Sequence, residues 1–230
     1  MNKAHRDRIA FMRIVSGRFD ADKEVYHVQG GKKLRLSRPQ QLMAAEREII
    51  EEAYAGDIIG VFDPGIFSIG DTLCAPGKKF RFDPIPTFAP EHFKRVRSLD
   101  TMKRKQFLKG MEQIAQEGAI QIFKTPYTGM EEVIVGVVGT LQFDVLEYRL
   151  KNEYNVELYM EGLPYEYLRW IETDDGEPVK EEDLILGTDV KLVEDYKGNQ
   201  LLLFGSQWAI GWTEERNKNL TFHEFGGTKF

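Results

Sequence analysis

The chain has 230 residues, of which 42% are hydrophobic and 30% are charged. This length gives room for one large or two ordinary domains with a buried core, and the composition is typical of a globular protein. No apolar run approaches the roughly 18 residues that a membrane helix requires, and the first residues lack the apolar region of a secretory signal. Cys74 is the only cysteine, which excludes an internal disulfide and suits a reducing cytoplasm.

The charge is unevenly distributed along the chain. The net charge is −6, yet residues 1–40 carry +6 and residues 81–110 carry +5. The remaining blocks are acidic, with −4 over 41–80, −6 over 111–170 and −7 over 171–230. Two basic blocks can meet phosphate groups while the whole molecule stays anionic. The plain alternative is that each block is a solvated face without a partner.

The first predicted element is a strand from Ile9 to Val15, rich in β-favouring side chains. Alternation places Ile9, Phe11, Arg13 and Val15 on one face and the intervening residues on the other. Ser16 and Gly17 end the strand. We interpret it as the founding strand of a small β-barrel.

Short strands separated by glycine turns continue to about residue 80. Residues 24–28 and 32–36 fit a hairpin around Gln29-Gly30-Gly31, and residues 58–62 fit a further strand. Residues 41–44 and 47–52 have helical propensity. Because the strands dominate, we predict an all-β barrel over residues 1–82.

The proline-rich segment 83–90 reads as a linker, since no helix passes through it. Beyond it, periodicity predicts strands at 92–97, 119–123, 132–138 and 156–160, with helices at 101–117 and 140–154. This order is the βαββαβ pattern of a ferredoxin-like unit. The apolar stripe that we predict on the second helix comprises Leu141, Val145, Leu146 and Leu150.

The remaining elements extend this second domain. We predict strands at 165–171, 190–194, 201–204 and 220–223, an acidic turn or short helix at 174–183, and a helix at 206–217. The spacing of Trp208 and Trp212 favours core packing over base stacking. The predicted fold is therefore two domains, an all-β barrel and, over residues 91–230, an α+β ferredoxin-like domain with extra C-terminal elements.

Catalytic motifs are missing from the sequence. No Gly-x-x-x-x-Gly-Lys-Ser/Thr stretch is present to hold nucleotide phosphates, and Asn217-Lys218 lacks the aspartate that would read guanine. Asp57-Ile-Ile-Gly60 and Asp195-Tyr-Lys-Gly198 are predicted to be structural turns. The four histidines show no metal-ligand spacing. We therefore predict that the chain is not an enzyme and holds no cofactor or metal of its own.

Surface recognition remains, and the basic side chains are the candidates for it. Phosphate contacts made by such residues fix position rather than read sequence, and they weaken with salt. The candidate contacts are Arg6, Arg8, Lys32, Lys33, Arg35, Arg38, Lys94, Arg95, Arg97, Lys103, Arg104 and Lys105.

Several motifs resemble one family over nearly the whole chain. In the first half they are His5-Arg-Asp-Arg-Ile-Ala-Phe-x-Arg-x-x-Ser-Gly17, Glu52-Ala-Tyr-x-Gly-Asp-Ile-Ile-Gly60 and Ile69-Gly-Asp-Thr72. In the second they are Pro86-x-Phe-Ala-Pro-Glu91, Lys105-Gln-x-Leu-Lys-Gly110, Val135-Gly-x-Val-Gly-x-Leu-Gln-Phe-Asp-Val145 and Arg149-Leu-Lys-x-Glu-Tyr-Asn-Val-Glu157. Together they resemble the peptide chain release factor 3 family of translational GTPases. Residues 174–199 depart from the family pattern.

The resemblance implies a cytoplasmic protein that contacts ribosomal RNA and small-subunit proteins in translation termination. It implies a longer parent GTPase whose own GTP-binding domain holds GTP or GDP with magnesium. That parent would promote dissociation of the stop-codon-decoding release factors, and no membrane would be involved. The chain would then be the C-terminal barrel and α/β domains, beginning at an internal methionine.

Two other interpretations stay open at this point. The barrel motifs are shared with elongation factor G, although the run Arg149–Glu157 favours the release factor. A ferredoxin-like small-molecule enzyme or regulator with an appended barrel would instead require a polar cluster in the second half of the chain.

Overall fold

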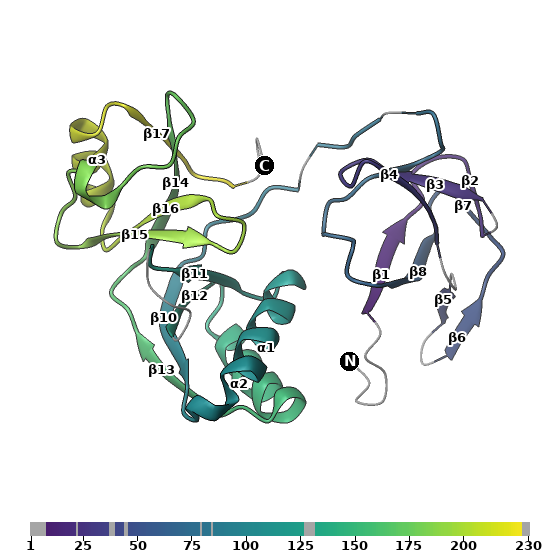
Figure 1. Ribbon diagram of the computed structural model, residues 1–230, viewed down its shortest axis with the longest axis horizontal. Coiled ribbons are helices and arrows are strands. Elements are labelled where there is room, and N and C mark those ends of the chain that lie inside the picture. Colours follow the sequence, from purple (N-terminus) through teal and green to yellow (C-terminus); the bar gives the residue numbers. More distant parts are fainter. Residues whose placement is uncertain are drawn as a thin grey trace. The chain divides into compact units, whose positions relative to one another are not determined.

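A computed structural model describes residues 8–21, 23–36, 40–43, 46–78, 80–83, 85–126 and 132–226. The chain forms two compact units, residues 1–85 and 86–230, and both are built mostly from β-strands (Figure 1). The two units are described separately below.

Unit 1 contains nine short strands in three sheets. The strands are β1 (Arg8–Arg13), β2 (Arg18–Asp20), β3 (Glu24–His27), β4 (Lys32–Arg35), β5 (Gln40–Met43), β6 (Glu46–Ile49), β7 (Glu52–Tyr54), β8 (Ile58–Asp63) and β9 (Leu73–Cys74). The sheet orders are β1-β8-β5-β6, β2-β7 and β4-β3-β9.

One hydrophobic core joins the three sheets of unit 1. Buried side chains come from β2 (Phe19), β7 (Ala53) and β8 (Ile59 and Val61), and Leu34 of β4 packs against them. On β8 the large side chains alternate, because Ile58 and Phe62 on the opposite face are exposed, while Gly60 between them is buried. The two-stranded sheet β2-β7 would be only marginally stable alone, so it depends on this shared core.

The predicted first strand and hairpin are confirmed. Strand β1 pairs antiparallel with β8, with Met12 facing the core and Phe11 exposed. Residues 41–44 and 47–52 have helical propensity, but their described residues form no helix. Strands β5 and β6 lie there instead, paired antiparallel with each other, and β5 also pairs with β8. Sheet pairing has overridden a weak local preference.

Unit 2 is built on one eight-stranded antiparallel sheet with the order β13-β10-β12-β11-β15-β16-β14-β17. The strands are β10 (His92–Ser98), β11 (Gln121–Lys124), β12 (Glu132–Val137), β13 (Leu158–Gly162), β14 (Tyr167–Thr173), β15 (Val190–Asp195), β16 (Gln200–Phe204) and β17 (Leu220–His223). The α-helices are α1 (Arg104–Gln116), α2 (Leu141–Tyr154) and α3 (Gln207–Arg216), and the 3₁₀ turns are η1 (Thr101–Lys103) and η2 (Glu181–Asp183).

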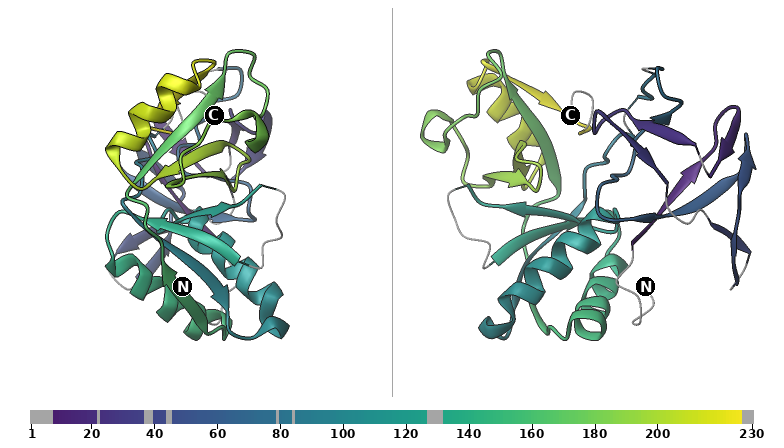
Figure 2. Two further views of the ribbon diagram at one scale, coloured as in Figure 1. Left: turned by 90° about the vertical axis from the view of Figure 1, so that its left-hand side faces the viewer. Right: turned by 45° about the vertical axis from the view of Figure 1, so that its right-hand side comes forward.

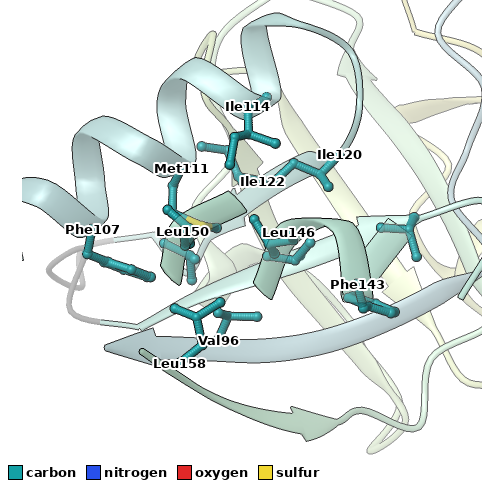
Figure 3. Close-up of a cluster of buried hydrophobic side chains, with 14 of the residues drawn as sticks. Val96, Phe107, Met111, Ile114, Ile120, Ile122, Phe143, Leu146, Leu150 and Leu158 are labelled. Carbon is teal, nitrogen blue, oxygen red and sulfur yellow. The ribbon is translucent and has the colours of Figure 1, made fainter. Parts of the chain in front are cut away.

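Helices α1 and α2 cover one face of the first half of this sheet, as Figures 1 and 2 show. The side chain of Asp100 accepts a hydrogen bond from the Met102 amide and caps the start of η1. Figure 3 shows Phe107, Met111 and Ile114 of α1 pointing toward the strands, where they meet Val96 and the buried side of α2.

The apolar stripe predicted on α2 is only partly correct. Leu146 and Leu150 are buried as expected, but Leu141 is 75% exposed and Val145 is also exposed. Phe143, at three and seven residues before those two leucines, completes the buried face instead. The sequence offers apolar residues on two sides of this helix, and the packing selects one.

The other face of the sheet packs against itself. Phe93, Phe123 and Ile134 from the first half join Leu168, Trp170, Val193, Leu201 and Leu203 from the second half in one buried cluster. Helix α3 covers the outer face of the second half through Ala209 and Ile210. The prediction that Trp208 packs in the core is wrong, because this side chain is 72% exposed.

Among the described residues, no helix has the length and apolar character needed to cross a membrane.

Gly110 controls the approach of α1 to α2. A Cβ atom at this position would lie 2.3 Å from Cδ2 of the fully buried Leu150 and 3.0 Å from the Tyr154 ring. Gly110→Ala should therefore destabilise the chain by about 1–2 kcal/mol, because overpacking outweighs the helix propensity that alanine gains. Urea denaturation followed by circular dichroism measures the change.

Gly211 in α3 is the matched control, because nothing lies within 4 Å of a Cβ placed there. Gly211→Ala should stabilise the chain by about 0.5–1 kcal/mol through propensity alone. Equal effects of the two substitutions would contradict the assigned role of Gly110.

Candidate nucleic-acid interface

The β3–β4 hairpin presents the first basic surface. Leu34 of β4 packs against the core of unit 1, so alternation directs Lys33 and Arg35 to the opposite, outer face. Lys32, Lys33 and Arg35 are all exposed. We call these three residues the hairpin patch. Arg6 and Arg38, two further basic candidates in the first half of the chain, lie outside the described residues.

Buried polar contacts hold this hairpin in place. His27 at the end of β3 is 3% exposed, and its Nε2 lies 2.8 Å from Oδ2 of Asp71. The Gln29 side chain accepts a hydrogen bond from the Thr72 amide and donates one to the Gly70 carbonyl. The Phe67 ring packs edge-on against His27. The position of the patch therefore depends on the segment 67–72.

Arg8 has a structural partner. Its guanidinium lies 3.2 Å from Oδ2 of Asp63, a carboxylate whose side chain is almost fully buried, and it also donates to the Phe67 carbonyl. The other oxygen of Asp63 accepts from the amides of Gly65, Ile66 and Phe67. These contacts tie Arg8 to the fold of unit 1.

The second basic group is divided between two faces of the sheet. Lys94 shares the helix-covered face with Val96, and its Nζ lies 4.4 Å from the centroid of the Phe143 ring. Arg95 and Arg97 project from the opposite face. Arg95 lies 3.4 Å from Glu161, and Arg97 lies 4.6 Å from the centroid of the Tyr159 ring. The basic run predicted from sequence is thus not a single surface.

Lys103, Arg104 and Lys105 lie at the turn from η1 into α1, just beyond the end of β10. Arg104 and Lys105 are exposed, and Lys103 is half-buried. They belong to the same end of the sheet as Arg97, because only two residues separate β10 from η1.

The candidate contacts predicted from sequence did not include Arg149 and Tyr159, two side chains whose contacts the structure defines. Arg149 of α2 forms ion pairs with Glu117 and Glu153, and these hydrogen bonds raise the pKa of its guanidinium above the usual value. Tyr159 of β13 faces outward because Leu158 faces the core. The signal for Tyr159 was this alternation, combined with the pairing of β13 and β10.

Nothing in the described part of the chain groups three or more histidine, cysteine, aspartate or glutamate residues so that they could hold a metal ion. His27 and His223 each lie beside a carboxylate, Asp71 and Glu172 respectively. The chemistry that these surfaces offer is attraction of anions and stacking on aromatic rings.

Comparison with known proteins places these features in a class. Residues 1–76 match the family model described as elongation factor G domain 2. Unit 1 is therefore similar to a domain of translation factors. Residues 82–214, more than half of the chain, match the family model described as class II release factor RF3, C-terminal domain. The chain belongs to this release factor family.

Individual relatives agree with the family models. The chain is 54% identical over 222 residues to the peptide chain release factor 3 of Symbiobacterium thermophilum, 45% identical over 224 residues to that of Gloeobacter violaceus, and 45% identical over 220 residues to that of Listeria monocytogenes. The alignments cover 96–97% of this chain but only 41–42% of each relative.

Asp71→Ala should destabilise unit 1 by about 1–3 kcal/mol, because it leaves the buried His27 ring without its partner. Urea denaturation measures the loss. Asp83→Ala is the matched control, an exposed aspartate of the same unit, and should change the free energy of unfolding by less than about 0.5 kcal/mol. A negligible effect of Asp71→Ala would remove the basis for a locked hairpin.

Proposed function

We propose that the chain is the ribosome-contacting C-terminal region of a peptide chain release factor 3. The observation that carries this proposal is the match of residues 82–214 to the C-terminal domain of that family. In this scheme the whole protein is a cytoplasmic GTPase of translation termination that promotes dissociation of the stop-codon-decoding release factors. Its partners are ribosomal RNA, small-subunit proteins and its own GTPase domain.

We propose finer assignments for the two units. Strands from all three sheets of unit 1 share one core, which supports a translation-factor barrel over residues 1–82. In unit 2 the order β13-β10-β12-β11, with α1 and α2 on one face, supports a ferredoxin-like βαββαβ unit with C-terminal additions over residues 91–230. Residues 83–90 are the proposed linker between them.

The hairpin patch is the proposed phosphate-contacting surface of unit 1. Its three cations lie on one hairpin, which the His27–Asp71 contact holds in place. Because the backbone of the hairpin is already fixed, binding a partner costs less conformational entropy. Fixed positive charges of this kind suit the phosphate backbone of ribosomal RNA, where contacts position the protein and carry no sequence information.

Lys33→Glu combined with Arg35→Glu should weaken sedimentation with ribosomes by about tenfold or more at low salt and reduce its salt dependence. The control variant combines Lys180→Glu with Lys218→Glu, two exposed lysines of the acidic second unit, and changes the net charge equally. The patch would be wrong if both variants sedimented alike.

Nucleotide binding offers a separate test. We propose that GTP and magnesium are held by parts of the relatives that this chain does not span, because its sequence contains no phosphate-binding loop. Equilibrium titration with a fluorescent GTP analogue should therefore show no saturable binding. An affinity in the micromolar range would contradict this division of roles.

A further inference from the structure

An aromatic ring and a guanidinium form an outward-facing pair at one edge of the unit 2 sheet. Tyr159 of β13 lies directly opposite Arg97 of β10, and the guanidinium is 4.6 Å from the ring centroid. Arg97 is exposed, and Tyr159 is 46% exposed. A tyrosine needed for core packing would be buried here, as its neighbour Leu158 is.

Arg97 lies over one face of the Tyr159 ring, and the Tyr159 side chain is 46% exposed. Arg97 covers the face that is turned toward β10. Strand β13 lies at the end of the sheet order, and β10 is the only strand paired with it among the described residues. The ring face turned away from Arg97 therefore points toward the free edge of the sheet.

The ring is surrounded by exposed apolar side chains and by charges of both signs. Glu132 of β12 stands opposite Arg97, and Glu157, two residues before Tyr159, pairs with Lys151. Leu99 is exposed and Met102 is 88% exposed where β10 runs into η1, and Lys103, Arg104 and Lys105 follow at the same end of the sheet. On the neighbouring row of the sheet, Arg95 and Glu161 neutralise one another. Aromatic side chains interleaved with cations are typical of surfaces that bind single-stranded nucleic acid.

We propose that Tyr159 is a stacking platform for an unpaired RNA base, with Arg97 holding the ring from behind and the cations at the start of α1 contacting the adjoining phosphates. The inference rests on the proposed ribosome contact and adds the chemistry of the ligand. Bases within a duplex are already stacked on one another, so the platform takes a base from a loop, bulge or strand end.

Fluorescence anisotropy with a labelled twelve-nucleotide single-stranded RNA, free of self-pairing, tests the platform in the full chain at low salt. Tyr159→Leu should lower the affinity about 5- to 100-fold, because base–aromatic stacking is lost. Tyr159→Phe keeps the ring and should bind within about twofold of the unmodified chain. Arg97→Gln should weaken binding with little change in its salt dependence, because it removes the cation that holds the ring and no phosphate contact.

Tyr148→Leu is the matched control, because Tyr148 is 68% exposed on α2 and lies beside Glu147 instead of a basic run. It should leave RNA affinity unchanged. Tyr159→Thr, a β-branched residue suited to a strand, repeats the ring deletion if the leucine variant proves unstable by circular dichroism.

The platform is overturned if the single strand does not bind, if ring deletion at Tyr159 leaves the affinity unchanged, or if Tyr148→Leu causes an equal loss. Ribosome sedimentation separates this outcome from the proposed function. Failure to sediment, with Tyr159-dependent RNA binding retained, counts against the ribosome contact alone. Sedimentation without Tyr159-dependent RNA binding counts against the platform alone.

Discussion

Strand β10 is the element on which unit 2 depends, because both of its faces are buried in hydrophobic cores. Val96 enters the core beneath α1 and α2, while Phe93 enters the core between the two halves of the sheet. A strand alternates strictly, so its charged residues cannot gather on one side. The Nζ atom of Lys94 lies over the Phe143 ring on one face of the strand, and Arg97 is exposed on the other. The alternation of the strand therefore places Lys94 against α2 and places Arg95 and Arg97 on the opposite face of the sheet.

The run Val135–Val145, one of the motifs that carry the family resemblance, has a clear role in packing. A Cβ at Gly136 would lie 2.6 Å from Pro90, so glycine is needed for that loop to cross β12. The Gln142 side chain accepts from the amides of Val138 and Gly139 and donates to the Ala119 carbonyl, which fixes the entry to α2. The residues of this run thus fix how β12, the segment before β10 and α2 meet.

Periodicity predicted the strands and helices of unit 2 because each has one buried face with regular spacing. Features that depend on pairing between distant strands could not be predicted from periodicity, because periodicity does not show which strands are neighbours. The helical propensity near residues 41–52 gave way to the β5–β6 pairing, and Tyr159 gained meaning only beside Arg97. A charge count along the chain also ignores faces, so it grouped Lys94 with Arg95 and included Arg8, whose partner Asp63 is buried.

The two candidate surfaces differ in physical character, and this difference suggests a division of labour. Lys32, Lys33 and Arg35 are point charges on a locked hairpin, whose attraction to phosphate acts at a distance and is screened by salt. The Tyr159–Arg97 pair acts only on contact, since stacking depends on overlap of two rings and varies little with ionic strength. Long-range charges govern the rate of encounter, whereas desolvated contacts govern the rate of dissociation. A chain with both proposed surfaces would meet its partner quickly and would be released by a change that withdraws a single stacked base.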